Sequence, residues 1–126
     1  MVQDLQARRA SKGQYGYGYV LNASINDVVC HGVPAELVVL QAGDIVNLDI
    51  TLEKNGYIAD SSKTYPVGEV GLSIRKRVRT AYEAMWKGIQ SVCPGARLGD
   101  IGWAIERHAT RGRRMGGDDQ RRVAFR

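Results

Sequence analysis

The stretch "DIVNLDITLEKNGYIADSSKTY", residues 44 to 65, predicts a β-hairpin. Apolar and polar residues alternate from 45 to 52, and a period of two is typical of a strand with one apolar face. Asn55 and Gly56 both tolerate a positive φ angle, so this pair is a strong signal for a two-residue turn. We therefore expect a second strand, residues 57 to 65, to return antiparallel to the first.

Two aspartates, Asp49 and Asp60, lie within this hairpin. With the turn at Asn55-Gly56, Thr51 faces Asp60, and Asp49 is the diagonal neighbour of Asp60 on the same face, about 7–8 Å away. A turn one residue earlier pairs the aspartates directly, whereas a three-residue loop places them on opposite faces. Two carboxylates this close repel unless one is protonated or a cation lies between them. The alternative is a solvated face with two unrelated acids.

The composition is that of a globular protein. The 126 residues suffice for one domain with a hydrophobic core, and 44% are apolar and 25% charged. No apolar run approaches the length of a membrane span, and residues 1 to 14 lack the apolar segment of a secretory signal. The two cysteines, Cys30 and Cys93, form no metal-type CxxC pair. These features favour a reducing, cytoplasmic location.

The net charge of +5 is unevenly distributed. Residues 110 to 126 hold six arginines and two aspartates, a net charge of +4, which leaves +1 for the other 109 residues. Such a basic tail can bind nucleic acid or ribosomes through their phosphates. The alternative is a disordered, solvated end of the chain.

The N-terminal third offers weaker signals. Residues 1 to 12 are expected to be the end of a helix or a frayed terminus, and the Gly- and Tyr-rich residues 13 to 19 a loop. Residues 21 to 34 contain a short strand that we expect to end at Cys30. His31 then lies where a strand meets a loop, a common place for binding residues, although a lone histidine is more often structural.

Two helices should follow the hairpin. The first begins after an N-cap at Ser73 and ends before Pro94, and an apolar stripe at helical spacing runs along it: Ile74, Val78, Ala81, Met85, Ile89 and Val92. Basic residues crowd its first turns, where the helix dipole favours acids. The second begins near Asp100 and has an inner stripe of Ile101, Ala104, Ile105 and His108. No periodicity follows Arg111, and the order of elements predicts an α+β fold.

Three stretches make a family recognisable: "SINDVVCHGVP", "AGDIVNLDITLEKNGYIADSSKTYPVGEV" and "PGARLGDIGWAIERHA". They resemble the N-terminal half of type I methionine aminopeptidases, metallopeptidases with the pita-bread fold. The resemblance runs from about Gly13 to Ala109 and covers about half of that family's catalytic domain. It implies half of a pita-bread fold, an antiparallel sheet with two helices packed on it. Residues 1 to 109 would form this partial domain, and residues 110 to 126 an Arg-rich tail that is disordered or frameshifted.

The resemblance also implies roles for five residues. Asp49 matches the aspartate that chelates one metal, and Asp60 the aspartate that bridges two. His31 matches the histidine that hydrogen-bonds the substrate and assists at the scissile peptide. Tyr17 and Cys30 fall where the family lines its pocket for the methionine side chain. The implied cofactors are two divalent metal ions, cobalt, manganese, iron or zinc, which activate a water that removes the N-terminal methionine of nascent polypeptides.

The family's site also takes a histidine, in a GHG motif, and two glutamates from its C-terminal half. This sequence has only His31 and His108 and no GHG motif. We therefore expect a truncated or frameshifted copy that is inactive alone and that self-associates through its exposed sheet. Three alternatives are a true short paralogue, a non-catalytic binding module on the same fold, and an RNA- or ribosome-associated protein that acts through its basic tail.

Overall fold

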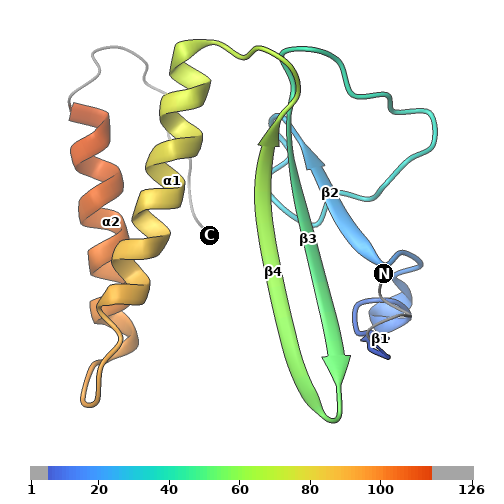
Figure 1. Ribbon diagram of the computed structural model, residues 1–126, viewed down its shortest axis with the longest axis horizontal. Coiled ribbons are helices and arrows are strands. Elements are labelled where there is room, and N and C mark those ends of the chain that lie inside the picture. Colours follow the sequence, from blue (N-terminus) through green and yellow to red (C-terminus); the bar gives the residue numbers. More distant parts are fainter. Residues whose placement is uncertain (1–5, 115–126) are drawn as a thin grey trace. The chain divides into compact units, whose positions relative to one another are not determined.

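A computed structural model describes residues 6 to 114, with side chains as far as Arg111 (Figure 1). The chain divides into two compact units, a sheet unit, Met1–Leu72, and a helical unit, Ser73–Arg126. In the described residues each unit is built from one layer of secondary structure. The division predicted at residue 109 stays a prediction. Helix α2 continues to Arg114, and residues 115 to 126 lie outside the described residues.

The sheet is antiparallel and is organised around its longest strands, β3 (Ile45–Lys54) and β4 (Tyr57–Pro66). Strand β4 pairs with one edge of β3. The other edge of β3 pairs first with β2 (Leu21–Ile25) and then with the short β1 (Arg8–Arg9). Figure 1 shows β2, β3 and β4 side by side. The central strand is therefore hydrogen-bonded along both edges.

The hairpin between β3 and β4 has the predicted register. Lys54 pairs with Tyr57 and Thr51 pairs with Asp60. Asn55 and Gly56 both adopt positive φ angles, 54° and 82°, as a two-residue turn between twisted strands requires. The turn therefore places Asp49 and Asp60 on one face of the sheet.

The N-terminal segment differs from the expected helix end. Arg8 and Arg9 form strand β1, which pairs with Glu53 and Leu52 of β3. The guanidinium of Arg8 donates to the carboxylate of Glu53 with a distance of 2.9 Å from Nε. This long-range pairing overrides the local sequence, which shows no strand periodicity.

Strand β2 ends at Ile25, five residues earlier than predicted. Asn26 adopts a φ angle of 53°, its side-chain amide donates to Asp44 at 2.9 Å, and its side-chain oxygen accepts from the Ile45 amide at 3.0 Å. These bonds tie the chain to the start of β3 and stop the strand. Cys30 and His31 consequently lie in the following loop and not at a strand end.

The loop after β2 folds back along the outer edge of that strand. The Ala23 amide donates to the Gly32 carbonyl at 2.8 Å, and the Gly32 amide donates to the Ser24 hydroxyl at 3.1 Å. A Cβ atom on Gly32 would lie only 2.2 Å from the Ala23 carbonyl oxygen. Only glycine allows the two backbones to approach this closely.

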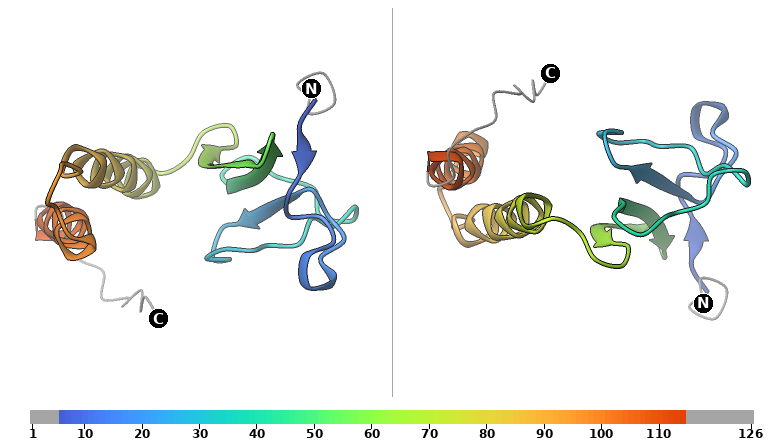
Figure 2. Two further views of the ribbon diagram at one scale, coloured as in Figure 1. Left: turned by 90° about the horizontal axis from the view of Figure 1, so that it is seen from below. Right: turned by 90° about the horizontal axis from the view of Figure 1, so that it is seen from above.

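The helical unit is an antiparallel pair, α1 (Leu72–Gln90) and α2 (Leu98–Arg114) (Figures 1 and 2). Ser73 was predicted to be the N-cap of α1, but it lies within the helix. Helix α2 begins two residues before Asp100, whose carboxylate accepts the Arg97 amide at 2.8 Å. Asp100 therefore caps α2 from its third position, as in a capping box. No described helix is long and apolar enough to span a membrane.

Small residues of α1 form the contact between the helices. Ala84 and Gly88 are buried, and Gly88 lies against Ile101 and Ile105 of α2. The predicted apolar stripe flanks this contact instead of filling it, so Met85 is 43% exposed and Ile89 50%. Among the described residues the buried apolar side chains are small: Val46, Val70 and Ala84.

Replacing Gly32 with alanine should destabilise the sheet unit. The added methyl group meets the backbone of Ala23, which cannot move without breaking the β2–β3 pairing, and such overpacking costs about 1–3 kcal/mol. Urea unfolding followed by circular dichroism measures the loss. Gly18→Ala is the matched control, since nothing lies within 4 Å of a Cβ there. Equal midpoints for the two variants would contradict the close approach.

Candidate metal centre

One face of the sheet is polar across three strands. On β3 every second side chain from Asn47 to Thr51 is polar. Their partners on β4 and β2 are polar as well, so that the face consists of Asn22, Ser24, Asn47, Asp49, Thr51, Asp60, Ser62 and Thr64. The opposite face of β3 holds Val46, Leu48, Ile50 and Leu52. The alternation of β3 thus separates a core face from a candidate site.

Hydrogen bonds organise the polar face. The Asn47 side chain donates to the Thr64 hydroxyl at 3.1 Å and accepts from the Ser62 hydroxyl at 3.0 Å. These bonds bridge β3 and β4 next to the aspartates. Ser24, the residue of β2 that pairs with Asn47, is 3% exposed. The wall beside the carboxylates is therefore fixed by side-chain contacts as well as by the sheet.

Each aspartate accepts one hydrogen bond from a neutral side chain. The amide of Asn22 donates to Asp49 Oδ2 at 3.2 Å, and the hydroxyl of Thr51 donates to Asp60 Oδ1 at 3.1 Å. Asp49 is half-buried and Asp60 is exposed. In the described part of the chain, the second oxygen of each carboxylate has no hydrogen-bond partner, and neither aspartate forms a salt bridge. These oxygens are therefore available to a cation.

Asp49 and Asp60 supply the kind of ligand atom that a hard divalent metal prefers, but they are too few to complete its coordination. Carboxylate oxygens suit magnesium-, manganese- and iron-type cations, and hydroxyl and amide neighbours can orient them. Residues 6 to 111 contain no group of three or more histidine, cysteine, aspartate or glutamate side chains placed to hold a metal ion. Asp49 and Asp60 can thus supply part of a metal centre and need further ligands to complete it.

Tyr17 lies close to this face. It follows the short 3-10 turn η1 (Gln14–Gly16), its hydroxyl donates to the Leu21 carbonyl at 2.9 Å, and its ring packs edge-on against Tyr19 at 5.8 Å. Burial raises the pKa of Tyr17 above its usual value, and the nearby Tyr19 and the charge of Asp49 raise it further. Tyr17 therefore shares the electrostatic environment of Asp49.

Cys30 and His31 are exposed in the loop after β2. His31 adopts a φ angle of 54°, and the next residue, Gly32, is bonded to Ser24 of the polar face. The loop thus holds the His31 backbone beside the edge of β2. Within the described residues, no hydrogen bond joins His31 to Asp49 or Asp60.

Sequence reasoning missed two residues of the polar face. Asn22 bonds directly to Asp49, and Ser24 holds the loop that carries His31. The signal was present, because Asn22 and Ser24 alternate with apolar residues in "LNASI" with a period of two. Their partners in β3 could be identified only once the register between β2 and β3 was known.

Comparison with known proteins identifies the class. Residues 1–123 match metallopeptidase family M24, and the chain belongs to this family. It is 43% identical to methionine aminopeptidase B of Synechocystis sp. over 113 residues and 46% identical to the methionine aminopeptidase of Rickettsia prowazekii over 94 residues. These alignments cover 86% and 75% of this chain but only 41% and 36% of the relatives.

Solved structures agree with this family. The crystal structure of the Rickettsia prowazekii methionine aminopeptidase has a TM-score of 0.83 at 41% identity, and that of Thermotoga maritima 0.85 at 34%. In both cases 87% of this chain is covered and 44% of the other. The predicted α+β class and the predicted half of a pita-bread fold are confirmed. The packing of the two helices on the sheet stays a prediction.

Removing the charge of Asp49 should lower the pKa of Tyr17 toward its usual value. A nearby anion disfavours the phenolate, so Asp49→Asn removes one of the causes that raise this pKa, while burial and Tyr19 remain. A titration of the tyrosine ring signals by NMR measures the shift, and Tyr17→Phe assigns the signal. Asp27→Asn, in the loop after β2, removes the same charge elsewhere and should leave Tyr17 unchanged. An equal effect of both substitutions would exclude the proximity of Asp49.

Proposed function

We propose that the chain carries the aspartate half of a methionine aminopeptidase metal centre and serves the removal of N-terminal methionine. The observation that carries the proposal is the placement of Asp49 and Asp60 on one polar face. The similarity to proteins named methionine aminopeptidase supports the substrate. Because the chain spans about two fifths of the length of these relatives, the activity of a whole enzyme is part of the proposal.

We assign Asp49 and Asp60 as ligands of a pair of divalent metals, cobalt, manganese, iron or zinc. When bound, such a pair supplies a nucleophilic water at neutral pH and polarises the carbonyl that is attacked. The free oxygen of each carboxylate and the neutral donors Asn22 and Thr51 support this assignment. A neutral hydrogen bond orients a carboxylate without competing for the metal as a salt bridge would.

The remaining site residues are assigned to the substrate. We propose that His31 donates a hydrogen bond to the peptide next to the scissile bond, and that Tyr17 and Cys30 line the pocket for the methionine side chain. The placement of Tyr17 near Asp49 supports its role. The closure of the loop by Gly32 on Ser24 supports that of His31, since it brings this residue to the edge of the polar face.

Asp49 and Asp60 are only part of the set of metal ligands that the family resemblance implies. The family resemblance requires one further histidine and two glutamates, and the second histidine of this chain, His108, lies on α2 and contacts Glu83 at 3.0 Å. His108 is therefore committed to a helix contact within the helical unit. We propose that Asp49 and Asp60 bind metal weakly by themselves and that catalysis needs ligands from another polypeptide segment.

Action on nascent polypeptides would place this function in the cytoplasm and near the ribosome. Proximity to the ribosome through residues 110 to 126, and self-association through an exposed sheet, are further predictions of the sequence. The partly exposed Leu48, at 39%, on the apolar face of β3 supports self-association. Most of the tail lies outside the described residues.

The purified 126-residue chain should not release methionine from a Met-Ala-Ser peptide, even with added manganese or cobalt. Among residues 6 to 111 no third metal ligand is placed near the two aspartates, and no further carboxylate is placed to take the proton of the water. General-base assistance alone is typically worth about 10²–10⁴-fold in rate. The assay compares the chain with Asp49→Ala. Turnover that disappears in this variant would show that the short chain builds a working site.

A chimera tests the proposed function itself. Residues 1 to 109 of this chain are fused to the part of the Rickettsia prowazekii methionine aminopeptidase that follows the aligned region. The fusion should release methionine from the same peptide in the presence of manganese, since it restores the missing ligands. Asp49→Asn or Asp60→Asn should abolish turnover, and Asp27→Asn, which removes a charge in a loop, should not. A folded chimera that is inactive, or that tolerates Asp49→Asn, would refute the assignment.

A further inference from the structure

The helical unit has two chemically different sides. One side is an apolar groove between α1 and α2, lined by Ala81, Met85, Gly88, Ile89, Val92, Ile101 and Ile105. The other side is marked by a polar contact between the helices, where Glu83 of α1 lies 3.0 Å from His108 of α2. The residues that surround this contact are not used by the proposed metal centre.

Basic residues surround the Glu83–His108 contact. On α1, Lys76 lies seven residues before Glu83 and Arg79 four residues before it. Lys87 lies four residues after Glu83, so all three share its side of the helix. On α2, Arg111 follows His108 by three residues and Arg107 precedes Arg111 by four. We call these five residues the basic face: Lys76, Arg79, Lys87, Arg107 and Arg111. With Glu83 the formal charge of this surface is five minus one, or +4.

The one acid on this surface is already paired. Arg79 Nε lies 2.7 Å from Glu83, and Arg79 and His108 together lower the pKa of Glu83, Arg79 by the larger amount. Within residues 6 to 111, the other four members of the basic face have no salt-bridge partner. All five members of the face are exposed. Their charges are therefore available to an external anion.

The charge is concentrated on this unit. Residues 73 to 111 contain eight basic and three acidic side chains, a net charge of +5, whereas residues 6 to 72 contain five basic and seven acidic ones, a net charge of −2. The sequence alone suggested that the tail is basic and the body nearly neutral. The body is nearly neutral because it combines one acidic unit with one basic unit.

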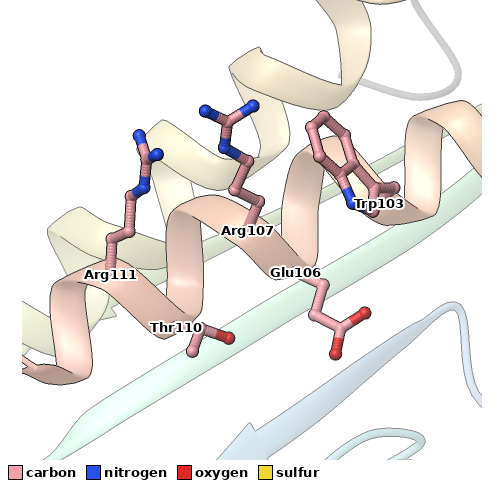
Figure 3. A pocket seen from close by; sticks show the side chains of 5 residues that line it. All are labelled: Trp103, Glu106, Arg107, Thr110 and Arg111. Carbon is pink, nitrogen blue, oxygen red and sulfur yellow. The ribbon is translucent and has the colours of Figure 1, made fainter.

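A tryptophan ring adjoins the basic face. The guanidinium of Arg107 lies 4.8 Å from the centre of the Trp103 ring, which is 59% exposed. These two residues and Arg111 line a surface hollow on α2, together with Glu106 and Thr110. Figure 3 shows Trp103, Arg107 and Arg111 on one side of the helix, with Glu106 and Thr110 directed away from them. Arginine planes and an aromatic ring are groups that bind phosphates and stack on bases.

We propose that the basic face binds the phosphate backbone of a nucleic acid without sequence selection. The four unpaired cations supply attraction to phosphates, and contacts to phosphates carry no direct sequence information. The first turn of α1 contains no acidic residue that would repel a phosphate. This gives a reason for the basic residues there, which cost the helix stability. The proposal does not depend on the proposed peptidase function.

An anionic membrane fits this surface less well. A helix that binds in a membrane interface needs apolar side chains next to its basic residues, so that they enter the lipid together. Here the aliphatic side chains that line the groove around Gly88 lie on the opposite side of the pair. Trp103, an aromatic residue beside the basic face, is in contact with the guanidinium of Arg107.

The test compares two full-length variants that lose three positive charges each. The face variant carries Lys76→Gln, Arg107→Gln and Arg111→Gln. The tail variant carries Arg121→Gln, Arg122→Gln and Arg126→Gln. Binding to a short fluorescent RNA duplex is measured by anisotropy over a series of salt concentrations. Each phosphate contact contributes about 0.9 to the slope of log affinity against log salt, so we expect the face variant to reduce this slope by about 2 to 3. At low salt the face variant should bind at least about tenfold more weakly than the parent.

The tail variant should keep most of the affinity and slope of the parent. A charge-retaining variant, Arg107→Lys with Arg111→Lys, should also bind nearly as well, and circular dichroism establishes that each variant keeps its helices. Equal losses in the face and tail variants would overturn the proposal, as would a parent chain that does not bind RNA. Binding to phosphatidylserine vesicles in place of RNA would instead identify a membrane surface and would equally refute it.

Discussion

The two-residue turn at Asn55-Gly56 is the constraint on which the rest of the sheet depends. Both residues adopt positive φ angles that most side chains disfavour, and this turn fixes the pairing of β3 with β4. A slip of one residue would turn every side chain of one strand to the other face. Asp60, Ser62 and Thr64 would then leave the polar face that they share with Asp49. One local conformation thus determines which residues of β4 join the candidate site.

Local signals predicted the elements that local chemistry controls. The hairpin, its register and the two helices follow from turn residues and from periods of two and 3.6. The errors occurred where distant residues decide. Asn26 ends β2 through bonds to Asp44 and Ile45, and β1 exists because Glu53 and Leu52 provide its partners. Such pairings leave no periodic trace in the segment that they shape.

The candidate site shows the same division. The shared face of Asp49 and Asp60 followed from the hairpin, but their surroundings depend on β2, a strand that joins from 27 residues away in sequence. Asn22 orients Asp49, and Ser24 anchors the loop at Gly32, so two strands and a loop meet at the carboxylates. Assigning His31 to a strand end was wrong for this reason: its position is set by Gly32 closing on β2, and not by the strand that precedes it.

The helical unit shows why an apolar stripe need not be a core. Contact between two helices is closest where the side chains are smallest, and Ala84 and Gly88 provide that line on α1. The larger residues of the predicted stripe, among them Met85 and Ile89, are displaced to one flank, where they form a groove. The opposite flank is polar, and Glu83, His108 and the basic face occupy it. With the small residues at the contact, the apolar groove lies on one flank of the pair and the charged surface lies on the other.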